Sequence, residues 1–410
     1  MPMIHIAPGV GIPARFANRH TVITGPAGMG KTVTMMKLME SFADRGAAVI
    51  APDMKGDLMA LTRSCNVSVL QPLTGPGVAM RLEMWRLGAD LMARALELPD
   101  AQAGAVEIAF AFAKERDYYL NTLKDFRNLL ALMAADPQQV AHLGYVTPAS
   151  IGTVQRALLR IETQGFGDLF GSPDYDIADS VPDGKVSIID VSRLIHSPAL
   201  YGAMMLYLLR EYATRLRECG DLPRPNVAIV IDQAHSLFDG ATPALMRSVD
   251  ATLRQMQSKG VALIFASQSA RDIPTIVRSQ CASTIEFARE FGVGHCRFTT
   301  LDRSGQTRPA RMIRTSPPQA RLGALTPDEV AALPVTARGS DQPAPVAPSL
   351  AMTPQDWRFL RLGITCVAIA HFVIYAAGGA WYLHALPWIA FAQLDNLLAR
   401  LAQPPDNPRR

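Results

Sequence analysis

The stretch GPAGMGKT, from Gly25 to Thr32, has residue types and a spacing that suit the binding of phosphate groups. It fits the pattern G-x-x-x-x-G-K-[ST], in which Gly28 and Gly30 leave the backbone amides free to turn inward around a β-phosphate. In this pattern Lys31 reaches the β- and γ-phosphates, and the hydroxyl of Thr32 binds Mg²⁺. The sequence therefore predicts a site for ATP and Mg²⁺.

The flanking residues supply the context that such a loop requires. The run TVIT reads as a strand before the loop, and KTVTMMKLMESFAD reads as a helix after it, whose N-terminal dipole favours an anion. A glycine-rich turn that matches by chance is the alternative, and the strand and helix argue against it. The predicted cofactor-binding residues are Gly25, Pro26, Ala27, Gly28, Met29, Gly30, Lys31, Thr32 and Val33.

A second stretch, VAIVIDQAHSLFDG, is an apolar run that leads into an acid, Asp232. An aspartate at the end of a buried strand supports magnesium in P-loop ATPases, although one that caps the next helix is the alternative interpretation. The next position normally holds a glutamate that activates water, and here it is Gln233, which carries no charge. Gln268, in FASQS at the end of a later apolar run, is predicted either to sense the γ-phosphate or to position water. We therefore predict Asp232, Gln233 and Gln268 as catalytic residues, and Thr32 and Asp232 (the latter through water) as the magnesium site.

Five short apolar runs have the nearly continuous hydrophobicity of parallel strands that are buried on both faces. They are HTVITG, AAVIAPD, KVSIIDV, NVAIVID and GVALIFAS. Helix-like segments separate them, which predicts a doubly wound α/β fold with a parallel sheet. Apolar residues at three- and four-residue spacing predict a helical insertion at residues 85–170, and residues 295–330 are predicted to form a terminal strand or hairpin.

Composition narrows the classes of function. The 410 residues carry a formal net charge of only +4, so a surface for nucleic acid would have to be local, and SARDIPTIVRSQ is the best candidate for it. Five scattered cysteines without paired spacing argue against a disulfide framework or a zinc site. The N-terminal residues lack the charged-then-apolar layout of a secretory signal.

The C-terminal part of the sequence contains a candidate membrane anchor. LGITCVAIAHFVIYAAGGAWYL, residues 362–383, spans about 33 Å as a helix, close to the thickness of a hydrocarbon core. Arg358 and Arg361 precede it and no Lys or Arg follows until Arg400, which predicts that residues 1–360 lie in the bacterial cytoplasm, tethered to the inner membrane. A buried helix that docks on the core is the alternative.

These patterns divide the chain into three predicted parts. Residues 1–330 form the P-loop ATPase core, and residues 331–356 form a linker that is rich in Pro, Ala and Ser. Residues 357–410 contain the hydrophobic helix and an amphipathic tail, WIAFAQLDNLLARLAQ.

The segment APDMKGDLMAL, which follows the predicted P-loop helix, resembles the D-x-K-G-D-L segment of HerA-like bacterial ATPases, within the HerA/FtsK superfamily of hexameric DNA motors. The resemblance covers about residues 15–325 in order. It continues through YLNTLKDFRNLLALM, GYVTPASIGTVQRALLRIETQGFGDLFGSPDYDIAD, GDLPRPNVAIVIDQAHSLFD, LRQMQSKGVALIFASQSARDIP and SPPQARLG.

This resemblance implies a RecA-like core, ATP and Mg²⁺ as ligands, DNA as a partner, and a hexameric ring in which the neighbouring subunit completes each nucleotide site. It supports a metal-binding role for Asp232 and a sensor role for Gln268. It also places Asp53, Lys55 and Asp57 near the nucleotide, without assigning a role to each of them.

Three positions depart from the family pattern. The family has D-E-A-H where this chain has Gln233, R-S-K-G where it has Gln257 before Ser-Lys-Gly, and an arginine where Thr284 falls. Loss of the carboxylate and of an arginine that acts on a neighbouring subunit predicts slow or partner-dependent hydrolysis. The nearby arginines that could replace it, each of which is alternatively a solvated surface residue, are Arg254, Arg271, Arg278 and Arg289.

Three functions are therefore open. The first is a membrane-tethered, ring-forming DNA translocase that hydrolyses ATP. The second is a hydrolysis-impaired ATP-binding scaffold or switch at the membrane, which Gln233 and Thr284 favour. The third is a small-molecule kinase with the same P-loop, which the long colinear resemblance disfavours.

Overall fold

The computed structural model describes residues 2–75, 77–173, 184–220, 222–323, 325–326 and 329. The chain divides into two compact units, residues 1–338 and 339–410, and the second unit lies outside the described residues. The predicted linker, anchor and amphipathic tail therefore lie outside them too, and the domain boundaries stay a prediction. Within the part of the chain that the structure describes, no helix is long and apolar enough to cross a membrane.

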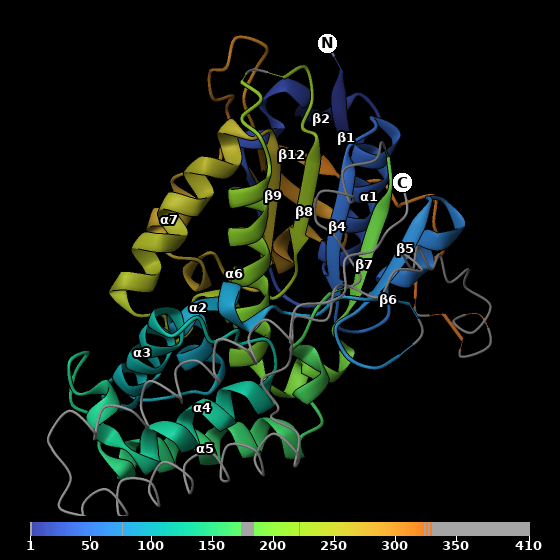
Figure 1. Ribbon diagram of the computed structural model, residues 1–410. Coiled ribbons are helices and arrows are strands. Elements are labelled where there is room, and N and C mark those ends of the chain that lie inside the picture. Colours follow the sequence, from blue (N-terminus) through green and yellow to red (C-terminus); the bar gives the residue numbers. More distant parts are fainter. Residues whose placement is uncertain are drawn as a thin grey trace, which may run out of the picture. The chain divides into compact units, whose positions relative to one another are not determined.

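The main sheet contains ten strands in the order β12-β11-β10-β3-β9-β8-β4-β7-β5-β6 (Figure 1). From β10 to β6, neighbouring strands pair in parallel. All five strands predicted from apolar runs are present and lie side by side in this sheet, which confirms the parallel α/β fold. They are β3 (Thr21–Thr24), β9 (Val261–Ser267), β8 (Val227–Ile231), β4 (Ala48–Asp53) and β7 (Val186–Asp190).

Strands that the apolar runs did not predict extend this block on both sides. On one side are β5 (Val67–Gln71) and the short β6 (Val78–Ala79), and on the other is β10 (Ser283–Phe287), which pairs with β3. In β5 and β10, buried residues alternate with more exposed ones, so neither has a continuous apolar run. Of the terminal strand or hairpin predicted for residues 295–330, the structure shows the hairpin, because β11 (His295–Thr299) and β12 (Arg311–Arg314) pair in antiparallel.

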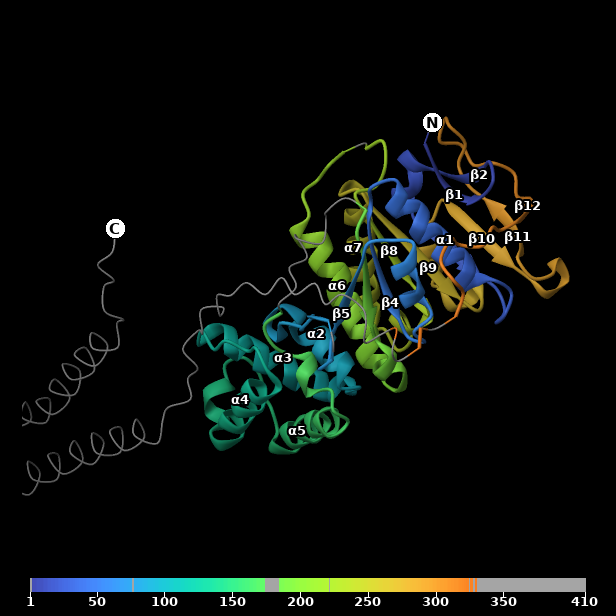
Figure 2. The same ribbon diagram turned by 90° about the vertical axis from the view of Figure 1, so that its right-hand side faces the viewer.

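Hydrophobic clusters lie on both faces of the sheet, because successive residues of a strand point to opposite sides. In β4, Ala48 and Ile50 belong to one cluster, whereas Val49 and Ala51 belong to the other. Helices α6 and α7 cover the first face, and α1 covers the second (Figure 2). The bounds are α1 (Lys31–Asp44), α6 (Pro198–Arg215) and α7 (Pro243–Ser258), and a separate two-stranded sheet of β1 (Met3–Ala7) and β2 (Val10–Pro13) lies beside α1.

Four helices lie together beside the sheet and form the helical insertion (Figures 1 and 2). They are α2 (Met84–Ala95), α3 (Asp100–Glu115), α4 (Leu123–Ala135) and α5 (Pro148–Thr163), which confirms that residues 85–170 are mainly helical. Thr122 and Thr147 cap the starts of α4 and α5 with their hydroxyls. The first helix, α2, packs against α6 and so joins the insertion to the main sheet and its helices.

A buried histidine, His20, joins the start of β3 to α7 and β9. Its Nδ1 accepts the N–H of Leu263 at 3.2 Å, and its Nε2 lies 3.2 Å from the carbonyl oxygen of Leu253. Burial is the main cause that lowers the pKa of His20 from 6.5 to about 4. The histidine therefore stays neutral in the folded protein at physiological pH.

We predict that the free energy of unfolding falls as the pH drops from 6.5 toward 4. The unfolded chain binds a proton in this range that folded His20 excludes, so the stabilisation is fully present above pH 6.5 and is lost as the pH falls. By pH 5 the loss is about 2 kcal/mol, at about 1.4 kcal/mol per pH unit. Urea unfolding of the full chain in detergent at pH 7 and pH 5 measures it. If the free energy of unfolding of His20→Gln falls just as much between pH 7 and pH 5, the loss does not come from His20.

Candidate nucleotide site

The predicted phosphate loop connects β3 to α1 at the carboxyl edge of the sheet. Gly30 precedes the helix in a left-handed conformation with φ 112°, and Lys31 is the first residue of α1. The ammonium group of Lys31 donates to the carbonyl oxygens of Gly25 at 2.6 Å and Pro26 at 2.9 Å. Lys31 thus lies over its own loop, with its charged end on the side where phosphates bind in this type of loop.

Two glycines of this loop have different structural roles. Gly25 has φ 145°, and a Cβ atom there would lie 2.5 Å from Cβ and 2.6 Å from the carbonyl oxygen of Phe287 in β10. Gly28 has φ 77°, and a Cβ atom there would meet nothing within 4 Å, so its surroundings are open. The first glycine therefore allows the loop to pack against the sheet, and the second lies where a ligand can approach the backbone.

Asp232 follows β8 at the same edge, and Gln233 follows it in a left-handed conformation with φ 52°. The N–H of Gln233 donates to Oδ1 of Asp232 at 2.9 Å, and the hydroxyl of Tyr201 in α6 donates to the carbonyl oxygen of Asp232 at 3.1 Å. The short helix η7 (Ala234–Leu237) that follows has no side-chain cap. Asp232 is therefore not a helix cap, and its second carboxylate oxygen has no hydrogen bond among the described residues.

The segment after β4 brings a second lysine to the site. Asp53 is buried, and its carboxylate accepts four backbone N–H groups, those of Lys55, Gly56, Leu58 and Met59, at 2.8 to 3.1 Å. These bonds fix the path of residues 54–59. Because β4 lies next to β8 in the sheet, this path places Lys55 close enough to Asp232 and Lys31 to act on both charges. Asp53 is therefore structural, and Lys55 belongs to the site.

Burial governs the charges at this edge. It raises the pKa of the Asp232 carboxyl, and the N–H of Gln233, then Lys55, Lys31 and His235, oppose that rise. Burial also lowers the pKa of the Lys31 ammonium. Asp232 raises this pKa and so opposes the effect, whereas Lys55 lowers it further. Two cations and one anion thus share a partly dry volume, which suits a ligand that brings several negative charges and one cation.

Gln268 directly follows β9, on the edge that carries the phosphate loop. The pairing of Thr24 with Ser267 places Gln268 next to the start of that loop at Gly25. The Gln268 side chain is exposed, while Asp272 accepts hydrogen bonds from the hydroxyl of Ser267 and the N–H of Ser269 and so fixes the turn. The structure thus brings the three predicted catalytic residues and the phosphate loop to one edge.

These residues fit a magnesium ion that is held partly by its nucleotide. Mg²⁺ is usually bound by one or two protein groups together with phosphate oxygens and water. Thr32, half-buried in the first turn of α1, and Asp232 supply such groups. Within the described residues no cluster of three or more His, Cys, Asp or Glu is arranged to hold a metal ion by itself.

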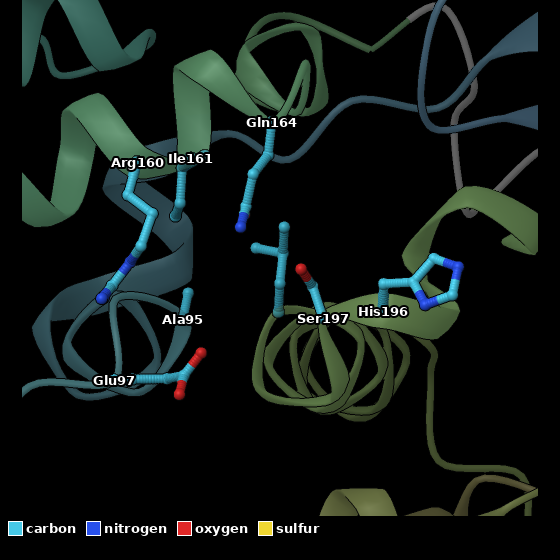
Figure 3. A pocket seen from close by; sticks show the side chains of 8 residues that line it. Ala95, Glu97, Arg160, Ile161, Gln164, His196 and Ser197 are labelled. Carbon is cyan, nitrogen blue, oxygen red and sulfur yellow. The ribbon is translucent and has the colours of Figure 1, made fainter.

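A cavity of about 100 Å³ lies elsewhere, between the insertion and the start of α6 (Figure 3). Gln164 after α5 and Ser197 before α6 point toward it from different sides (Figure 3). It shares no lining residue with the phosphate loop or with the Asp232 edge, so it is not part of the nucleotide site.

The family model for the helicase HerA-like C-terminal domain matches residues 5–71 and 63–291 of this chain. These matches cover well over half of the sequence and include every residue of the site. The chain belongs to the HerA-like C-terminal family. No curated protein sequence gives a significant match.

Two solved structures have a similar fold. The plasmid coupling protein TrwB in complex with ADP and Mg²⁺ aligns over 82% of this chain and 84% of its own, with 14% identity and a TM-score of 0.53. VirB4 of Thermoanaerobacter pseudethanolicus aligns over 76% of this chain and 90% of its own, with 17% identity and a TM-score of 0.51. At these identities the likeness shows the fold.

Of the three positions at which this HerA-like chain departs from its family, Gln233 lies at the edge that carries the phosphate loop, whereas Gln257 and Thr284 do not. Gln257 lies at the end of α7, before β9, so the length of that strand, about 23 Å at about 3.3 Å per residue, separates it from Gln268. Thr284 is exposed on β10. Among the four nearby arginines, Arg254 pairs with Asp250 at 3.1 Å and Arg278 donates to the hydroxyl of Thr275 at 3.1 Å, while Arg271 and Arg289 are exposed.

Sequence reasoning identified the phosphate loop, Asp232, Gln233 and Gln268, and the structure brings them to one edge. It named Lys55 without a role. The signal that points to Lys55 is its place two residues beyond the end of a predicted parallel strand, because side chains after such strands gather at one sheet edge.

Proposed function

We propose that this chain binds ATP and Mg²⁺ and works as a ring-forming HerA-like ATPase that translocates DNA, with slow or partner-dependent hydrolysis. The observation that carries the proposal is the convergence of the glycine-rich loop, Lys31, Lys55 and Asp232 at one edge of a parallel sheet. Amides and lysines at such an edge suit phosphates, and the acid suits a metal ion.

Each group of the site has a role that its position supports. The amides of residues 25–32 and the ammonium of Lys31 hold the β- and γ-phosphates, and Lys55 adds a second positive charge. Thr32 and Asp232 hold Mg²⁺, the latter through water. When bound, Mg²⁺ neutralises phosphate charge. Gln233 and Gln268 orient the attacking water by hydrogen bonding.

The proposal of a ring rests on the resemblance to HerA-like ATPases, in which the neighbouring subunit completes each nucleotide site. Efficient phosphoryl transfer commonly uses an arginine, worth about 10³ to 10⁵ in rate, which a partner can supply. In a ring, a neighbouring copy of this chain would supply that group.

The proposal that the chain translocates DNA is supported mainly by its family membership and by one segment next to the nucleotide site. The basic segment predicted from the sequence, residues 269–280, starts directly after Gln268 and contains η8 (Ala270–Asp272) and α8 (Thr275–Arg278). Its exposed Arg271 lies three residues beyond the predicted sensor. DNA that binds this segment would therefore lie close to the nucleotide site.

A second candidate function is a hydrolysis-impaired ATP-binding scaffold or switch. Gln233 is the specific observation that favours it, because glutamine orients water but cannot take its proton as a carboxylate can. In this case nucleotide binding would assemble the ring without turnover.

We predict that Gln233→Glu raises kcat at least about tenfold while the affinity for ATP changes less than about twofold. A carboxylate at this position acts as a general base, which contributes about 10² to 10⁴ in rate where the rest of the site is intact. Steady-state ATPase assays on the full chain in detergent, with and without DNA, measure the change.

Gln268→Glu is the matched control, since it adds a carboxylate at the same edge but on another strand. A flat response of Gln233→Glu, with no turnover in any variant and no effect of DNA, would contradict the motor and favour the scaffold.

We also propose that residues 362–383 anchor the chain in the inner membrane, with residues 1–360 in the cytoplasm. The apolar length of this segment and its flanking arginines support the proposal.

Membrane fractionation provides the test of the anchor. We expect the full chain to stay in the pellet after carbonate extraction, and a chain that ends at residue 356 to move to the supernatant. Equal release of both chains would contradict the anchor.

A further inference from the structure

An arginine of the helical insertion reaches the turn that follows Asp232. Arg94 lies in the last turn of α2, and its Nη2 donates to the carbonyl oxygen of Ser236 at 2.9 Å and to that of Asp239 at 2.9 Å. We call residues 232–241 the Asp232 turn. Arg94 therefore joins two carbonyl groups of this turn to the insertion.

The Asp232 turn is closed by its own hydrogen bonds, so a shift at one end moves the other. Ser236 N–H donates to the carbonyl oxygen of Gln233 at 3.0 Å, and Asp239 N–H donates to that of His235 at 2.9 Å. Arg94 thus holds the two residues whose amides fix Gln233 and His235. Arg94 is therefore linked through Ser236 to the backbone of Gln233.

Helix α6 leaves just enough room for this contact. A Cβ atom on Gly202 would lie 2.4 Å from the carbonyl oxygen of Ser236 and 3.1 Å from Nη2 of Arg94. The neighbouring Tyr201 donates to the carbonyl oxygen of Asp232. The turn is therefore held by α6 at its start and by Arg94 of α2 farther along.

As a purely structural contact, Arg94 would cost folding free energy. Its Nε and Nη1 are buried and have no hydrogen-bond partner among the described residues. Buried N–H groups without acceptors cost free energy, so an apolar side chain would join these helices at lower cost. A site that departs from the usual rule in this way is commonly kept for function.

Helix α2 is divided into two segments before it reaches Arg94. Gly88 has φ 77° and ψ 166° and interrupts the helix, so residues 84–87 and 89–95 are separate segments. Arg210 of α6 holds this interruption by donating to the carbonyl oxygen of Leu87 at 3.1 Å and to Asp90. Arg94 lies on the second segment, so its place depends on how that segment packs between α3 of the insertion and α6.

We propose that Arg94 is a positioning residue that couples the helical insertion to the backbone of Gln233, so that the rate of hydrolysis depends on how the insertion holds the Asp232 turn. The proposal rests on the ATPase function proposed above. It assigns the insertion a regulatory role over the nucleotide site.

Arg94→Ala tests the coupling by two readouts on the full chain in detergent. Hydrogen exchange without nucleotide is expected to rise about tenfold for amides 233–241, because Ser236 and Asp239 lose the link that holds the turn to α2. The value of kcat is expected to fall about 10- to 100-fold, with KM within about twofold, because misplacement rather than binding is affected. Arg94→Lys keeps the positive charge but lacks the planar guanidinium with its several N–H donors. Its amide exchange and its kcat are expected to lie between those of the wild type and those of Arg94→Ala.

Arg86→Ala is the matched control, since Arg86 also joins α2 to α6, through Glu211 at 2.9 Å, but does not touch the Asp232 turn. It is expected to leave the exchange of 233–241 and kcat near the wild-type values. If Arg94→Ala does not fold, Gly202→Ala displaces the carbonyl of Ser236 from the α6 side and is expected to give the same two changes.

The outcomes separate this proposal from the ATPase function. Unchanged exchange of 233–241 in Arg94→Ala overturns the link, and raised exchange with unchanged kcat overturns its effect on hydrolysis. If the wild type shows no turnover, the proposed function fails and exchange alone decides whether Arg94 holds the turn.

Discussion

The carboxyl ends of β3, β8 and β4 meet at one edge of the sheet, and the charged side chains that follow them share a partly dry volume. Lys31, Lys55 and Asp232 attract or repel one another there, while burial disfavours the charged form of Lys31 and of Asp232. Their mutual attraction offsets only part of that cost. A triphosphate opposite the lysines and a metal ion beside the acid would supply the remaining charges.

Binding and hydrolysis have different structural requirements in this chain. The groups that suit binding all come from one subunit and one sheet edge. The proposed hydrolysis is less well supplied, because Gln233 carries an amide at the position where a carboxylate would act as the general base. In our proposal Arg94 makes the rate of ATP hydrolysis depend on the helical insertion as well. The rate can therefore change while the affinity for ATP stays the same.

Most of the fold could be predicted from the sequence where burial or backbone geometry imposes a local pattern. Strands β3, β4, β7, β8 and β9 are buried on both faces and read as apolar runs. The phosphate loop is predictable because its glycines are needed locally. Strands β5 and β10 have alternating burial and form because β7 and β3 offer pairing partners, which no local pattern reports.

The same distinction applies to the site. Asp232 and Gln268 follow apolar strands, so their place at the edge is a consequence of local sequence and parallel pairing. The role of Lys55 depends on β4 lying next to β8, and the contact of Arg94 with Ser236 joins residues 142 positions apart. Such relations arise from strand order and helix packing, and spacing along the chain does not encode them.

The central claim is that the loop after β3, with Lys31, encloses the phosphates of ATP. Calorimetric titration of the full chain in detergent with ATP and Mg²⁺, compared with Lys31→Ala, tests it most directly. The account predicts that the variant binds about 10- to 100-fold more weakly, because one charged hydrogen-bonding group contributes about 1.5 to 3 kcal/mol. Equal affinity in a variant that is folded by circular dichroism would contradict the account.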